Sequence, residues 1–231
     1  IKTAFELLHV DRGGLYLDPK IGVHHNVVEI DFASLFPSII ASRNISPETM
    51  GCLCCNPEIT GASRLGVLPL DVESNTRLIS DRRRLSVKHH LSVPNTRLYA
   101  CTRQHGFLGR VVAPIIERRR WLKSCRQSKG DEWDRRQNIL KWLLVTCFGY
   151  TGYRNARFGR IECHEAICAW AREILLIAIE ESQNEGWSAL HAIVDSLWLS
   201  DIKTRNSEER RQSIDRVIAR IEARVGVHID L

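Results

Sequence analysis

The hydrophobic pattern of the chain predicts helices in its second half. Apolar residues recur at helical spacing over residues 110–126, 132–148, 164–181 and 207–225. A short Lys-Gly-Asp turn separates the first two segments, so we expect an antiparallel helical hairpin there. The third segment is apolar on nearly every side, which is typical of a buried helix. Ser207 is expected to cap the last helix.

Short strand patterns lie before and between these helices. An apolar run over residues 27–30 leads into Asp31, and a helical turn is expected over 34–40. Further strands are expected at residues 158–162, 190–199 and 227–231. The middle one of these segments is long enough for two strands, with Asp195 in the turn between them.

Residues 57–108 show little hydrophobic periodicity and carry the basic run Arg82-Arg83-Arg84. A solvated, variable insertion is the ordinary interpretation of such a stretch. A contact with nucleic acid is the alternative, because the run is positively charged.

Four cysteines lie close to or within this insertion. Cys52, Cys54, Cys55 and Cys101 could together hold zinc, although their spacing matches no standard zinc motif. A free cysteine also behaves as a small hydrophobic residue in a core. The pattern leaves both roles open.

Composition limits the function only weakly. A chain of 231 residues can form one large or two small domains. The net charge of +6 favours a polyanionic partner. No apolar run reaches the roughly 20 residues that a membrane span needs. Because the first residue is Ile and no signal peptide is present, we expect a segment of a longer chain.

Two sets of charged residues are candidates for chemistry. Asp31 follows an apolar strand, where a carboxylate is costly unless something pairs with it. A divalent metal is one such partner, because hard cations take oxygen ligands, and capping of the next helical turn is the other explanation. Arg119 and Lys123 are four residues apart and project from one helix face. That face suits phosphate groups, or it is simply solvated.

Several stretches resemble motifs of family-B DNA polymerases. Residues 31–40 are similar to the first palm motif, Asp-x-x-Ser-Leu-Tyr-Pro-Ser-Ile-Ile, with Phe36 at the Tyr position. Residues 141–149 are similar to Lys-x-x-x-Asn-Ser-x-Tyr-Gly, and residues 191–196 to the third motif, Tyr-Gly-Asp-Thr-Asp-Ser. Residues 117–123 resemble the fingers sequence of the same family. The altered third motif resembles that of a divergent archaeal paralogue group.

The resemblance implies an α+β fold. It would consist of a palm of antiparallel sheet backed by helices, with an inserted two-helix antiparallel fingers hairpin. The first part of the palm would cover residues 1–56, the irregular basic insertion 57–108, the fingers hairpin 109–149 and the second part of the palm 150–231. The thumb and exonuclease regions of the family are expected outside this segment, in further regions or in separate subunits.

The resemblance also implies a metal site. Asp31 and Asp195 match the two acids that bridge both catalytic metals in the family, and the backbone carbonyl of Phe32 is an expected further ligand. The metal would be Mg²⁺, with Mn²⁺ as a substitute. Lys141 would act beside these acids as a catalytic residue that donates a proton to the leaving pyrophosphate.

The incoming nucleotide would be held from two sides. On the fingers, Arg119, Lys123 and Lys141 would meet its triphosphate. From the first motif, the nucleotide-binding residues would be Ser34, Leu35 and Phe36. The aromatic ring at position 36 would lie under the sugar and leave no room for a 2′-hydroxyl; ordinary core packing is its alternative role.

The implied activity is template-directed DNA synthesis. Its partners would be primer-template DNA and deoxynucleoside triphosphates, and its location the cytoplasm, at the nucleoid. Val145, His191 and Ile193 depart from the family pattern, and Ile193 replaces the first acid of the third motif. That loss implies reduced activity. The rival interpretation is a polymerase-like module that binds primer-template DNA without extending it, as a structural or regulatory subunit. A fold by itself does not separate the two.

Overall fold

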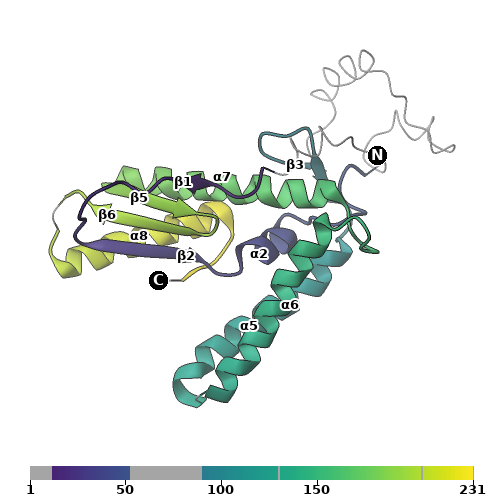
Figure 1. Ribbon diagram of the computed structural model, residues 1–231, viewed down its shortest axis with the longest axis horizontal. Helices are drawn as coiled ribbons and strands as arrows, with labels where there is room; N and C mark the ends of the chain where they lie inside the picture. Colours follow the sequence, from purple (N-terminus) through teal and green to yellow (C-terminus); the bar gives the residue numbers. More distant parts are fainter. Residues whose placement is uncertain (1–11, 53–89, 130, 204, 231) are drawn as a thin grey trace, which may run out of the picture.

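The chain has an α+β architecture with two parts. The computed structural model describes residues 12–52, 90–129, 131–203 and 205–230. One part is an antiparallel sheet backed by helices, and the other is a pair of long helices that projects from it (Figure 1). This is the fold class expected from the sequence.

Within the described residues, the main sheet has five strands in the order β1-β5-β6-β2-β7, and every neighbouring pair is antiparallel. The strands are β1 (Tyr16–Leu17), β2 (Val27–Phe32), β5 (Trp187–Ile193), β6 (Ser196–Asp201) and β7 (Ile229–Asp230). On β2, Ile30 and Phe32 are buried, whereas Glu29 and Asp31 are exposed. This alternation packs one face of the sheet on the core and leaves the other face open, which keeps Asp31 accessible.

Two helices back the sheet. These are α7 (Ile161–Glu185) and α8 (Ser207–Val225), which lie behind the strands in Figure 1. As expected for a helix that is apolar on most sides, α7 supplies many buried residues, among them Ile167, Ile174 and Leu175. The two layers are also joined by a hydrogen bond of 3.1 Å from Trp187 Nε1 on β5 to Ser213 Oγ on α8.

A short helix, α2 (Leu35–Ser42), connects the sheet to the projecting pair. Its residues Leu35, Ile39 and Ile40 are almost completely buried. It packs against α7, which backs the sheet, and against both projecting helices. The turn at the end of β2 is therefore held between the two parts of the molecule.

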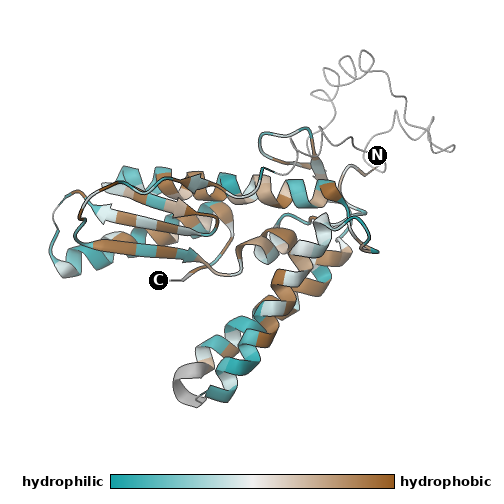
Figure 2. Cartoon of the chain, in the orientation of Figure 1, coloured by the Kyte–Doolittle hydropathy of each residue, from teal (hydrophilic) through white to brown (hydrophobic). Residues whose placement is uncertain are grey.

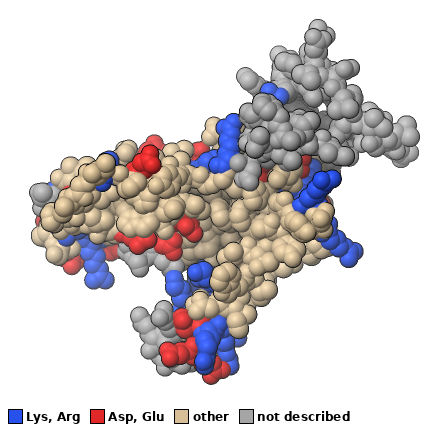
Figure 3. Space-filling model, viewed as in Figure 1, with Lys and Arg blue, Asp and Glu red and all other residues tan. Residues whose placement is uncertain are grey.

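The projecting pair consists of α5 (Phe107–Lys129) and α6 (Asp131–Gly152), which pack side by side as the expected antiparallel hairpin (Figure 1). Hydrophobic residues concentrate in the half near the sheet, and polar residues at the far end (Figure 2). At that far end, acidic and basic side chains mix on the visible face (Figure 3). None of the helices that the structure describes is long and apolar enough to cross a membrane.

The ends of the helices differ from the sequence prediction. Gly149 does not end the second helix, because α6 continues to Gly152. The expected cap Ser207 is instead the first residue of α8, and Asn206 is the cap. The Asn206 side chain accepts from the backbone N–H of Glu209, and the Glu209 side chain accepts from the N–H of Asn206, so both donors are satisfied.

The predicted strand at residues 158–162 is wrong. Residues 153–160 form turns, and α7 begins at Ile161. The N–H of Arg160 bonds to the carbonyl of Thr151 at the end of α6, which closes this connection as a loop.

Part of the segment expected to be irregular is ordered as a hairpin. Strands β3 (His90–Ser92) and β4 (Tyr99–Cys101) pair antiparallel, and Met50 bridges to Ala100. The basic run at residues 82–84, and with it the suggested nucleic-acid contact, lies outside the described residues.

Candidate active site

A row of residues crosses the open face of the sheet at the position of Asp31. Asp31 on β2 is paired in register with Ser196 on β6, and Ser196 is paired with Ile193 on β5. Directly paired residues point to the same face of an antiparallel sheet. Ser196 Oγ accordingly donates a hydrogen bond of 3.2 Å to Asp31 Oδ1. Ile193 therefore shares a face with Asp31, two strands away.

The turn that carries Asp195 is braced by backbone hydrogen bonds. The carbonyl of Asp195 accepts from Phe32 N–H at 2.9 Å, and Val194 N–H donates to Leu15 at 2.9 Å. Asp195 N–H donates back to the carbonyl of Ile193, which makes a tight turn centred on Val194. Val194 has a φ of 56°, a left-handed conformation that a β-branched residue rarely adopts. Such strain persists where the surrounding structure imposes it, as it does here.

The carboxylates of Asp31 and Asp195 repel each other electrostatically. Burial raises the pKa of Asp195, the Asp31 carboxylate raises it further, and Lys141 opposes the shift. A cation placed between the carboxylates would relieve both the repulsion and the loss of hydration. Carboxylate and carbonyl oxygens are the donors that Mg²⁺ takes, so Asp31, Asp195 and the nearby backbone fit a magnesium ion. Among the described residues, no group of three or more His, Cys, Asp or Glu side chains gathers as a metal cluster.

Ser34, in the turn after β2, connects the sheet to the projecting helical pair. It has a φ of 51°, and its side chain does not cap α2. Its hydroxyl instead accepts a hydrogen bond from Arg119 Nη1 on α5. Arg119 is held from its other side, because its Nε donates to Gln137 Oε1 on α6 at 3.2 Å. Residues of both α5 and α6 therefore take part in fixing this guanidinium over the turn.

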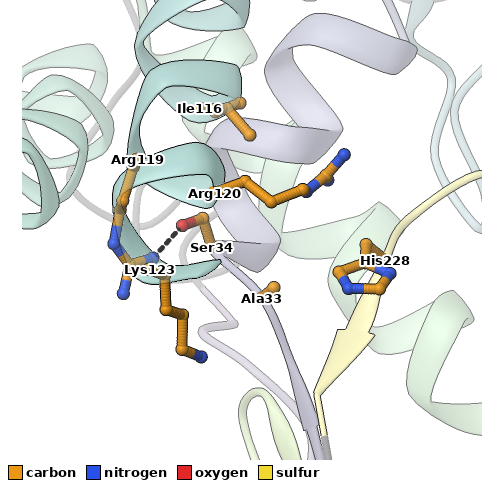
Figure 4. A pocket seen from close by; sticks show the side chains of 7 residues that line it. All are labelled: Ala33, Ser34, Ile116, Arg119, Arg120, Lys123 and His228. Atoms are coloured by element: carbon orange, nitrogen blue, oxygen red, sulfur yellow. Dashed lines mark hydrogen bonds between the residues drawn. The ribbon is translucent and has the colours of Figure 1, made fainter. Parts of the chain in front are cut away.

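A pocket opens beside Ser34, between α5 and the edge of the main sheet (Figure 4). Its described lining residues are Ala33, Ser34, Ile116, Arg119, Arg120, Lys123 and His228. Three of these are cations of one helix, so the pocket has the charge to attract a phosphate group. The sequence analysis named Arg119 and Lys123 but missed Arg120 and His228. Arg120 was adjacent to the named residues, whereas no motif pointed to His228.

Lys141 does not line this pocket. It lies exposed on α6, and its charge acts on Asp195. The structure therefore brings Lys141 to the side of the acids, while Arg119 and Lys123 face the pocket beside Ser34.

The first-motif residues Leu35 and Phe36 occupy different environments. Leu35 is 2% exposed and belongs to the core, so a nucleotide contact at this position has to come from its backbone. Phe36 is partly buried and stacks on Phe148 of α6, with ring centroids 4.1 Å apart. Phe148 stacks in turn on His164 of α7 at 4.7 Å. This three-ring stack links α2, α6 and α7, so Phe36 has a packing role whatever else it contacts.

The positions that depart from the motifs are not part of the core. Ile193 is 40% exposed and Val145 is 49% exposed. His191 is partly buried, and its Nδ1 lies 2.6 Å from the carbonyl of Leu17. Since a carbonyl only accepts, this nitrogen carries the proton and donates, which ties β1 to β5.

Two of the four candidate zinc ligands lie in the described residues. Cys52 and Cys101 are buried together and pack against Tyr99. The hydroxyl of Tyr99 donates to the Cys52 carbonyl at 3.0 Å. Cys54 and Cys55 lie outside the described residues. The visible pair packs as small hydrophobic side chains.

Comparison with known proteins gives a consistent set of relatives. The sequence model of DNA polymerase family B matches residues 8–212. DNA polymerase 2 of Saccharolobus solfataricus is 30% identical over 97% of this chain and 27% of its own length. A DNA polymerase of Archaeoglobus fulgidus is 27% identical over 95% of this chain and 24% of its own length. The chain thus spans about a quarter of the length of these curated relatives.

A solved structure shares the fold. The family B DNA polymerase from the hyperthermophilic archaeon Pyrobaculum calidifontis matches with a TM-score of 0.64 and 24% sequence identity. The match covers 95% of this chain and 25% of that protein.

Proposed function

Because this chain belongs to DNA polymerase family B, we propose that it forms the palm and fingers of a template-directed DNA polymerase. The reaction is nucleotidyl transfer from a deoxynucleoside triphosphate to a primer 3′-hydroxyl. The observation that supports this most is the meeting of two elements at one turn. Asp31 and Asp195 lie on the palm side of the turn, and the cations of α5 lie on the fingers side.

The acids would hold the metal. Asp31, Asp195 and the carbonyl oxygen of Phe32 are the proposed ligands of Mg²⁺, and Mn²⁺ is a substitute. When bound, the metal would activate the primer hydroxyl and stabilise the leaving oxygens in a two-metal mechanism. Ser196 holds one oxygen of Asp31 by its hydrogen bond, and so helps to fix the orientation of that carboxylate.

The cations would hold the triphosphate. Arg119 has a planar guanidinium that suits phosphate oxygens, and its bonds to Ser34 and Gln137 keep it extended over the turn. Lys123 adds a point charge one helical turn away. Lys141, near the acids, would donate a proton to the pyrophosphate as it leaves. Ser34 and the backbone of Leu35 would meet the same phosphates.

Phe36 would select the sugar. Its ring is held by the stack on Phe148, so it does not move aside easily. A fixed ring beneath the sugar leaves no space for a 2′-hydroxyl and favours deoxyribonucleotides.

The domain division follows from this function. Residues 1–56 and 150–231 would form the palm, 109–149 the fingers, and 57–108 an insertion between them. The further partners are primer-template DNA and the exonuclease and thumb regions of the family, present as additional regions or separate subunits. Such a substrate places the protein with the nucleoid in the cytoplasm.

A second candidate function rests on Ile193. The third motif lacks one of its two acids, and Val145 replaces a polar residue on the fingers. A module with a weakened metal site would bind primer-template DNA and serve as a structural or regulatory subunit. The retention of Asp195 favours an active but slow enzyme.

Primer extension tests the proposal. The complete protein is incubated with labelled primer-template DNA, the four deoxynucleoside triphosphates and Mg²⁺, and then with Mn²⁺. Asp31→Asn should abolish extension yet leave DNA affinity within about twofold, because phosphate contacts are spread over many residues. Asp18→Asn, which alters an exposed acid before β2, is the matched control and should extend normally. Binding without extension by the unaltered protein under both metals would favour the second candidate.

A further inference from the structure

The triphosphate pocket has a wall that comes from the end of the chain. His228 precedes β7, and β7 pairs with β2 beside the catalytic turn. The carbonyl of His228 accepts a hydrogen bond of 3.1 Å from Ala33 N–H, so this part of the backbone is fixed against that turn. Figure 4 shows the His228 ring across the pocket from Arg119 and Lys123, with the Arg120 side chain between the two sides. Palm and fingers therefore both contribute to one anion pocket.

The His228 ring is oriented by an acid outside the pocket lining. Its Nδ1 lies 2.7 Å from Glu222 Oε1 on α8. Since the carboxylate only accepts, Nδ1 carries a proton and donates. The same oxygen accepts a hydrogen bond from Ile229 N–H at 2.8 Å, so Glu222 Oε1 accepts two hydrogen bonds. The second ring nitrogen, Nε2, lies on the opposite edge of the ring from this contact, and the ring itself lines the pocket.

The pocket has the charge for an extended anion. Arg119, Arg120 and Lys123 line it, and none of its described lining residues is acidic. Arg119 and Lys123 line one side of the pocket. Arg120 and His228 line the rest of the pocket (Figure 4), where the far end of a triphosphate would emerge.

We propose that His228, held by Glu222, binds the terminal phosphates of the incoming nucleotide from the palm side, opposite Arg120. This inference rests on the proposed function and assigns a new contact within its site. His228 would act as a binding residue that closes the pocket from the palm.

A purely structural role is the competing explanation. The bond between His228 and Glu222 joins the start of β7 to α8, and it would do so without any nucleotide. The two roles differ in what an arginine would do at this position. An arginine pairs with Glu222 and also offers donors to phosphate, whereas alanine offers neither.

The test measures binding of inorganic tripolyphosphate to the full chain by calorimetry, without DNA. His228→Ala should weaken binding by at least about tenfold, the lower end of the loss expected when a hydrogen bond to a charged group is removed. His228→Arg should restore affinity to within about twofold. Arg120→Ala leaves the contact with Glu222 intact and should weaken binding by a similar factor. His24→Ala is the matched control, because His24 is an exposed histidine that bonds to the Lys20 carbonyl and lies outside the pocket lining.

The outcomes are distinct. Unchanged affinity in His228→Ala would overturn the inference. So would a loss that arginine does not restore, accompanied by a lower melting temperature in both variants. A parallel measurement of the nucleotide KM and kcat separates this inference from the polymerase proposal. Absence of extension by the unaltered protein contradicts the polymerase, whereas extension with an unchanged KM in His228→Ala contradicts only the role of His228.

Discussion

Restoring the lost acid of the third motif should strengthen metal binding at the proposed site between Asp31 and Asp195. In Ile193→Asp, the new carboxylate would stand on the same face of the sheet as Asp31, because both residues pair with Ser196. Two strand spacings separate the backbones of positions 193 and 31, which is about 9–10 Å. A side chain at position 193 that leans toward Asp195 would bring its charge to roughly 7 Å from a metal between the acids.

The magnitude follows from Coulomb's law. A divalent cation and a single carboxylate about 7 Å apart attract by roughly 1 kcal/mol in a water-like medium. Position 193 is 40% exposed, so the water-like value is the appropriate one. One kcal/mol corresponds to about a fivefold change in metal affinity. The protein on one side of position 193 lowers the local dielectric constant, which strengthens the attraction and raises the expected change toward about tenfold. The same exposure means that the new carboxylate is not buried and does not carry a large desolvation cost.

The assay is a metal titration of primer extension at low ionic strength, where screening is weakest. Ile193→Asp should lower the Mg²⁺ concentration for half-maximal extension by about five- to tenfold. Ile193→Asn is the control, because it has nearly the same shape and the same weak strand preference but no charge. An intact melting transition with an unchanged metal requirement in Ile193→Asp would refute the reasoning. An equal gain in the asparagine variant would show that charge is not the cause.

Three further predictions concern other parts of the site and the fold. Because the pKa of Asp195 is raised in the folded chain, its ionisation lowers the stability of the fold as pH rises above the ordinary carboxyl range. Asp195→Asn should therefore raise the melting temperature of the metal-free protein at pH 7 and abolish extension. An unchanged melting temperature would count against the electrostatic account. Phe36→Ala removes the stack on Phe148, so it should lower the free energy of unfolding by about 0.5–1.5 kcal/mol for the stack alone. It should also raise kcat/KM for ribonucleotides relative to kcat/KM for deoxyribonucleotides. Arginines of α8 lower the pKa of Glu185 to about 2, so its stabilising charge is present above pH 4.5 and is lost as pH falls toward 2; Glu185→Gln should melt earlier than the unaltered protein at pH 7, and the two curves should converge near pH 2.

Local patterns in the sequence determined the elements and most of the named site. Helical periodicity located α5, α6, α7 and α8, because the spacing of apolar residues along a helix can be recognised within a short stretch of sequence. The acid after a strand and the acid in a hairpin turn were likewise local signals, and the structure places Asp31 and Asp195 within electrostatic reach of each other. The element ends were less accurate, because caps and turns depend on hydrogen bonds to other segments, such as the bond from Arg160 to Thr151.

Contacts between distant segments were decided only by the tertiary structure. The register that sets Ile193 and Asp31 on one face joins residues more than 160 positions apart, and no periodic pattern encodes such a pairing. The bond from Arg119 to Ser34 depends on how the helical pair docks on the palm. His228 has no motif around it and reaches the pocket because β7 pairs with β2. The sequence specifies which side chains are present, but the packing of the sheet and helices decides which of them share a site.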